Sequence, residues 1–136
     1  MSSPTLIKAC LAFLAFAALS VGLPAAFAPG TFFDDYPFFA SWVGLLPPYN
    51  EHLVTDVGGL YLGFGFLFIW ALLKPSRQLI LPLCAGWFIA QALHFVFHVG
   101  HLENFDTADA VAQTIGLALI MLVPLIPVWI LAGRRI

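Results

Sequence analysis

The chain has 136 residues, of which 62% are hydrophobic and 9% are charged, and its formal net charge is −2 at pH 7. Its length fits a single domain, but a mean hydropathy of +0.99 excludes an ordinary soluble domain, so we expect an integral membrane protein. The few basic residues also exclude a nucleic-acid-binding surface and a basic amphipathic helix for anionic lipid.

Four apolar segments are each long enough to cross a bilayer about 30 Å thick, which takes about 20 helical residues. In chain order they cover residues 6–27, 53–73, 78–99 and 110–132. We therefore predict an all-α fold, a four-helix transmembrane bundle made by a single domain over residues 1–136. The turn at residues 74–77 is short, so the second and third helices should be adjacent antiparallel neighbours.

The first segment has a second interpretation. A short basic start and an apolar run precede the Ala-Phe-Ala sequence at residues 26–28, a pattern that is also typical of a cleaved secretory signal. We expect a retained helix and keep cleavage as the alternative.

Residues 29–50 form the longest connection and are rich in aromatic residues. Residues 37–46 suit a short helix lying at the headgroup boundary. The segment is either an ordinary aromatic belt or a cap over an outer cavity.

The charged residues separate by face. The basic residues lie at one face: Lys8, Lys74, Arg77, Arg134 and Arg135. The acidic residues lie at the other: Asp34, Asp35, Glu51, Asp56, Glu103, Asp106 and Asp109. By the positive-inside rule both termini are cytoplasmic, and the acidic face, which also carries the histidines, is external or periplasmic. Cys10 and Cys84 lie away from that face, and no CxxC occurs, so both should be apolar packing residues.

Three predicted helices each carry a polar stripe near the acidic face. At 100° per residue, the stripes are Gln91, His94, His98 and His101 on the third helix; His52, Thr55, Asp56, Gly59 and Gly63 on the second; and Asp109, Gln113 and Gly116 on the fourth. Polar groups that face lipid cost several kcal/mol, so we expect the stripes to face one another and form a pocket in the outer half of the bundle.

Within this pocket a divalent metal site is the leading hypothesis. His94 and His98 are spaced i and i+4, as are His52 and Asp56 on the neighbouring helix, and imidazole with carboxylate suits Zn, Fe, Mn or Cu(II). The residues expected to support these ligands or line the rim are Glu51, Gln91, His101, Glu103, Asp109 and Gln113. Haem b is the less favoured variant, with His94 or His98 opposite His52 and with Gly59 and Gly63 leaving room for the ring.

Other functions fit the same residues, including some that need no cofactor. In one alternative the stripes form interhelical hydrogen bonds in a non-enzymatic accessory or interaction subunit. In such a subunit the aromatic outer loop would contact a membrane-protein partner. The small size of the chain, with Gly58 and Gly65 expected to face away from the main seam, suggests a homo-oligomer. A quinone- or proton-linked pocket is a further alternative. No motif of nucleophilic catalysis occurs, so an enzyme is not favoured; His98 would be its first titrating group.

Two stretches carry a family resemblance. The sequence NEHLVTDVGGLYLGFGFLFIWALL, followed by a basic turn and two more helices, resembles the DoxX-like group of small four-helix bacterial membrane proteins. The sequence HFVFHVGHLENFDTADAVAQTIGLAL is similar to short multi-pass members without an assigned function. The resemblance implies a bacterial inner-membrane location and, because some relatives are linked to quinone-coupled sulfur oxidation, strengthens the quinone alternative. It implies no role for the three histidines.

Overall fold

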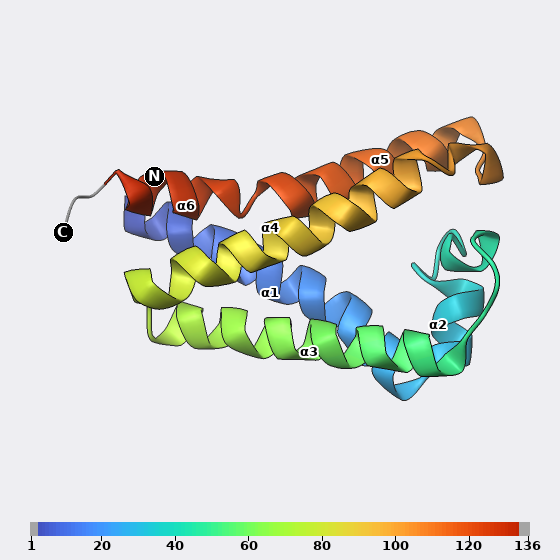
Figure 1. Ribbon diagram of the computed structural model, residues 1–136, viewed down its shortest axis with the longest axis horizontal. Coiled ribbons are helices and arrows are strands. Elements are labelled where there is room, and N and C mark those ends of the chain that lie inside the picture. Colours follow the sequence, from blue (N-terminus) through green and yellow to red (C-terminus); the bar gives the residue numbers. More distant parts are fainter. Residues whose placement is uncertain (1–2, 134–136) are drawn as a thin grey trace.

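A computed structural model of the chain describes residues 3–133, and within this range every regular element is helical (Figure 1). The elements are α1 (Ser3–Phe27), α2 (Pro29–Asp35), η1 (Val43–Leu45), α3 (Glu51–Leu73), α4 (Arg77–Val99), η2 (Leu102–Asn104), α5 (Thr107–Leu122) and α6 (Leu125–Ala132). Four helical stretches are long and apolar enough to cross a membrane: α1, α3, α4 and the combined α5–α6 stretch. The prediction of four helical stretches with the length and composition of membrane spans is confirmed.

Three of the long helices begin directly after a capping side chain. Asn50, Ser76 and Asp106 precede α3, α4 and α5, and each side-chain oxygen accepts a hydrogen bond from the backbone N–H three residues later. This contact satisfies one of the donors that a helix N-terminus leaves free. The tight turn between α3 and α4 follows from the short interval between Leu73 and Arg77.

The fourth span is divided by proline. Pro124 has no N–H to donate to the carbonyl of Ile120, four residues earlier, and the helix is interrupted between α5 and α6. The indole of Trp87 on α4 supplies the missing donor, with its Nε1 3.1 Å from the Ile120 oxygen. A side chain of one helix thus satisfies the backbone group that a proline releases on another.

The bundle consists of two groups of helices. α3 packs along α1, whereas α4 packs mainly against α5 and α6 (Figure 1). The prediction that α3 and α4 would be close neighbours holds only near their turn, because the two helices diverge from it. We call the end of the bundle with this turn the basic end and the end with α2, η1 and η2 the acidic end. The start of α1 and the end of α6 both lie at the basic end.

Glycine explains the close contact of α1 and α3. A Cβ on Gly58 would meet the backbone of Ala25 and Ala26, and one on Gly65 would lie 2.7 Å from Leu19 Cδ2. The expectation that Gly58 and Gly65 face away from the main seam is therefore wrong. They form that seam, since helices approach most closely where side chains are smallest.

A core of buried side chains joins the two groups in the half of the bundle nearer the basic end. Its largest fully buried members are Trp87, Phe68, Leu11 and Leu14, and Cys84 is buried beside them. Cys10 is also buried and both thiols are free, as expected for packing residues. The core closes this half of the bundle, which leaves the acidic half as the place for a cavity.

Residues 29–50, which we call the aromatic segment, differ from their prediction. Its regular helix is α2, which begins at Pro29, and residues 37–46 contain only the short η1. Proline at the first helical position favours the start of a helix, whereas the position before Pro37 disfavours helical conformation. The interfacial helix expected at 37–46 is therefore wrong in position, and the segment folds at the acidic end (Figure 1).

Candidate functional site

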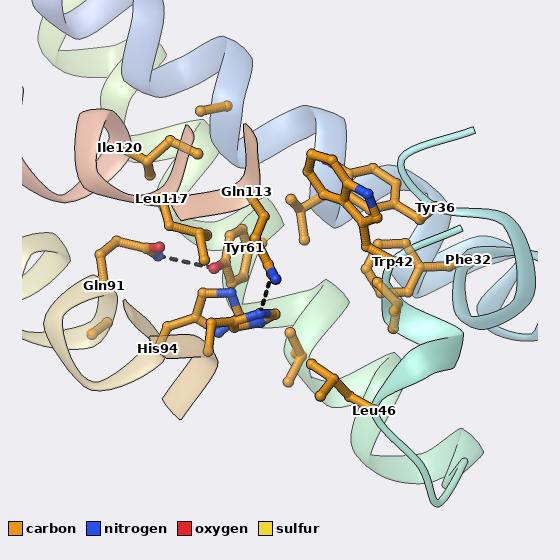
Figure 2. A pocket seen from close by; sticks show the side chains of 16 residues that line it. Phe32, Tyr36, Trp42, Leu46, Tyr61, Gln91, His94, Gln113, Leu117 and Ile120 are labelled. Carbon is orange, nitrogen blue, oxygen red and sulfur yellow. Dashed lines mark hydrogen bonds between the residues drawn. The ribbon is translucent and has the colours of Figure 1, made fainter. Parts of the chain in front are cut away.

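A cavity of about 360 Å³ lies in the acidic half of the bundle, where the two groups of helices diverge. Its walls come from α1, α3, α4, α5 and the aromatic segment, and Figure 2 shows their side chains facing a common space. The lining residues are Ala17, Val21, Phe32, Tyr36, Trp42, Val43, Leu46, Val57, Tyr61, Ala90, Gln91, His94, His98, Gln113, Leu117 and Ile120. This size is at the lower end of ordinary small-molecule pockets.

One polar pair on the wall joins α3 to α4. Gln91 is only 3% exposed, and its Nε2 donates to the Tyr61 hydroxyl oxygen at 2.9 Å. The Tyr61 ring packs edge-on against Trp87, with ring centroids 5.4 Å apart. The Tyr61 hydroxyl is thereby held in place while its own proton is left for a further acceptor.

A second pair joins α4 to α5. His98 Nδ1 lies 2.8 Å from Gln113 Oε1. With the amide in this orientation its oxygen accepts, so His98 donates from Nδ1 and Nε2 of the neutral ring is an acceptor. The bond fixes the orientation of the Gln113 amide. Gln113 is 2% exposed, so its other end, Nε2, is held in the interior of the protein.

Two nitrogen donors of the pocket are buried without a hydrogen-bond partner in the part of the chain that the structure describes: Gln113 Nε2 and Trp42 Nε1. An unpartnered buried donor costs about 1–3 kcal/mol. Both residues line the cavity, so an acceptor oxygen brought by a bound molecule would relieve this cost.

The opposite side of the pocket is aromatic and belongs to the segment between α1 and α3. Figure 2 shows Phe32, Tyr36 and Trp42 gathered across from Tyr61, Gln91 and His94. The Phe32 and Tyr36 rings lie 4.7 Å apart, in a tilted arrangement. The segment was predicted to be either an ordinary aromatic belt or a cap over an outer cavity. Because its side chains line the cavity, the second interpretation is favoured.

The structure brings only part of the predicted site together. His94 and His98 both line the cavity, with ring centroids 4.5 Å apart. His52 and Asp56 do not line it. They form an exposed pair at the start of α3, with His52 Nε2 3.0 Å from Asp56 Oδ2 and side-chain exposures of 80% and 58%. Within residues 3–133 no group of three or more His, Cys, Asp or Glu side chains is placed to hold a metal ion.

The stripe predicted on α3 faces outward. Gly59 and Gly63 are exposed, and nothing lies within 4 Å of a Cβ built on either. They therefore do not border the cavity that was expected to receive a haem edge. The polar members of the stripe lie exposed in the first turns of α3, at the acidic end, where they need no buried partner.

The residues expected to support a metal divide in the same way. Gln91 and Gln113 are the most deeply buried polar residues of the described chain and line the cavity. His101 lies outside the lining, with its ring 4.2 Å from that of Phe97. Glu51 and Glu103 are exposed, and Asp109 is half-buried in the first turn of α5.

Sequence reasoning missed Tyr61 and Trp42. Tyr61 is separated from Gly58 by three positions and shares its face, so the face of α3 that packs on α1 also presents a hydroxyl to the pocket. The sequence did offer one signal for Tyr61. A phenol hydroxyl in the middle of an apolar helix needs a hydrogen-bond partner, which points to the interior of the bundle. Nothing in the sequence pattern placed the indole of Trp42 on the bundle.

The pocket combines an apolar body with neutral polar groups. Among the residues that the structure describes, its lining contains no Asp, Glu, Lys or Arg. Burial of an ion is costly without a partner of opposite charge, so the site suits an uncharged molecule with apolar parts and hydrogen-bonding oxygens. Comparisons of the chain with family models, with curated proteins and with solved structures find no match.

Proposed function

We propose that this multi-pass membrane protein binds a small, uncharged, lipid-soluble molecule in the pocket between α3, α4, α5 and the aromatic segment. The observation that supports the proposal is the buried Gln113 amide, which His98 holds at one end and which has a free donor at the other. A quinone is our first candidate, since it is apolar and neutral and carries carbonyl acceptors. The resemblance to DoxX-like proteins favours the same class.

The proposal includes an orientation. We place the protein in a bacterial inner membrane with the basic end in the cytoplasm, because Lys74 and Arg77 flank the turn at that end. The pocket then lies in the outer leaflet, and its ligand enters from lipid or from the outer surface.

A pocket-blocking variant tests binding. The probe is a decyl-substituted 1,4-benzoquinone, added to the full chain in lipid nanodiscs while thermal unfolding is followed. At 100 times its dissociation constant, a ligand that binds only the folded state stabilises it by about 2.7 kcal/mol. We expect this stabilisation to be lost in Leu117→Trp, because Leu117 lines the cavity, and kept in Leu119→Trp, because Leu119 is 52% exposed. No stabilisation of the unaltered chain, or equal stabilisation of both variants, would overturn the proposal.

Metal binding is the second candidate, supported by the 4.5 Å separation of the His94 and His98 rings. Two imidazoles one helical turn apart provide two of the three or four ligands that a zinc site needs, so the others would come from water or from a bound molecule. Elemental analysis of the purified protein tests this. Bound metal that is lost in His94→Ala and kept in His52→Ala supports the site; metal content that is unchanged in His94→Ala contradicts it.

An accessory subunit without a ligand is the rival function. In that case the pairs Tyr61–Gln91 and His98–Gln113 serve only to join helices. It predicts that Gln113→Met lowers stability and that no probe stabilises the chain.

A further inference from the structure

We infer that the pocket recognises an uncharged ring with two acceptor oxygens, one bound by Gln113 Nε2 and the other by Trp42 Nε1. The inference rests on the proposed function and specifies its ligand class. It predicts that one ligand connects the helix bundle to the aromatic segment.

The two donors belong to different parts of the molecule. Gln113 lies on α5, and Trp42 lies in the aromatic segment directly before η1. Figure 2 shows them on different walls of the same space. Both nitrogens are buried and lack a partner in the described chain. A molecule with a single acceptor satisfies one of them; a molecule with an acceptor at each end satisfies both.

The orientation of the Gln113 amide makes the first contact selective. Because Oε1 accepts from His98, the end of the amide that has no partner is an N–H and not an oxygen. An acceptor such as a carbonyl oxygen is therefore favoured over a donor at this position. Trp42 strengthens the same preference, since an indole N–H only donates.

The shape and charge of the lining restrict the rest of the ligand. Aromatic side chains contribute to several walls, with Phe32, Tyr36 and Trp42 on one side and Tyr61 on another. Flat rings pack well against aromatic faces and edges. The described lining has no Lys or Arg to balance a carboxylate or phosphate, so a neutral quinone-type ring is favoured over a fatty acid.

The experiment compares two probes on four variants. Decyl-1,4-benzoquinone has two carbonyls, and decyl phenyl ketone has one. Calorimetric titration of the full chain in nanodiscs measures the dissociation constant of each for Gln113→Met and Trp42→Phe. Matched controls are Gln78→Met, at an exposed position of α4, and Trp129→Phe, whose side chain is 79% exposed.

We expect each pocket variant to weaken quinone binding about 2- to 12-fold, the range for one hydrogen bond between uncharged groups, and the controls to leave it unchanged. The ketone should be weakened by only one of the two pocket variants. Unchanged quinone affinity in Gln113→Met and Trp42→Phe, with binding still blocked by Leu117→Trp, overturns the two-acceptor inference and leaves the proposed function standing. No quinone binding to the unaltered chain overturns the proposed function itself.

Infrared spectroscopy of the unaltered chain provides a first readout that needs no substitution. With carbonyl-labelled quinone bound to the unaltered chain, both carbonyl stretching bands should shift to lower frequency, as hydrogen-bonded carbonyls do. In Trp42→Phe one band should return to its unbound position. Two unshifted bands in the unaltered chain contradict the inference.

Discussion

Replacing Gly58 by alanine should weaken the packing of α1 on α3, and Gly59→Ala provides a matched control one residue away. A Cβ at Gly58 would lie 2.7 Å from the Cα atom of Ala26, and it would meet backbone atoms, which cannot rotate aside. A Cβ at Gly59 would have nothing within 4 Å. Overpacking of this kind costs about 1–3 kcal/mol, whereas both variants gain about 1 kcal/mol of helix propensity. The difference in unfolding free energy between the variants isolates the steric term, which we expect to be about 1–3 kcal/mol.

The assay is unfolding in mixed micelles with increasing SDS, followed by tryptophan fluorescence, because Trp87 is fully buried in the core. Gly65→Ala extends the series. Its Cβ would meet the tip of the Leu19 side chain at 2.7 Å, which can move, so its cost should lie between those of the other two variants. Equal stability of Gly58→Ala and Gly59→Ala would refute the assignment of Gly58 to the α1–α3 seam.

Three further changes should separate the stabilising contacts. Trp87→Phe should cost about 1–3 kcal/mol in thermal unfolding, because it leaves the carbonyl released by the proline of the fourth span without a donor, whereas Trp129→Phe should cost less than about 0.5 kcal/mol; equal losses would contradict this. Gln91→Leu should cost about 1–3 kcal/mol and leave the Tyr61 hydroxyl unpartnered, which the band position of the tyrosine ring in ultraviolet resonance Raman spectra would report. Asp106→Ala should cost about 0.5–2 kcal/mol through loss of the α5 cap, measured by faster amide hydrogen exchange in the first turn of α5; unchanged exchange there would contradict the role of the cap.

The four apolar helices were predictable from the sequence, because the thickness and apolar interior of a bilayer determine how long and how hydrophobic a spanning helix must be. The helix caps also have a local signal in the sequence, because a polar residue directly before a long apolar run has few other roles. Asp106, for example, stands just before the apolar run of the last span and caps α5 there. Such features depend on neighbouring residues alone.

The face of α3 was not predictable in the same way. In a membrane, lipid-facing and interior side chains are both apolar, so periodicity says little about which face is inside. Gly59 and Gly63 have the spacing of a helix-packing seam, but Gly58 and Gly65 are the pair that contacts α1. The polar residues near the start of α3 led to the wrong face being predicted as the interior one. Polar side chains at the end of a membrane helix do not need to be buried. His52 and Asp56 pair with each other at the surface.

The position of the pocket follows from how bulk and polarity are distributed along the helices. Large core rings such as Trp87 and Phe68 fill the half of the bundle nearer the basic end, where the short turn also holds α3 and α4 together. Beyond this core the helices diverge, and the polar groups that line the cavity are amides, phenols, an indole and imidazoles. Two hydrogen bonds join these groups across helices, Tyr61–Gln91 and His98–Gln113, and among the described residues Gln113 Nε2 and Trp42 Nε1 are buried without a partner. One of them, Gln113 Nε2, belongs to an amide whose other end already accepts from His98, so a ligand oxygen bound at Nε2 would complete the hydrogen bonds of this side chain.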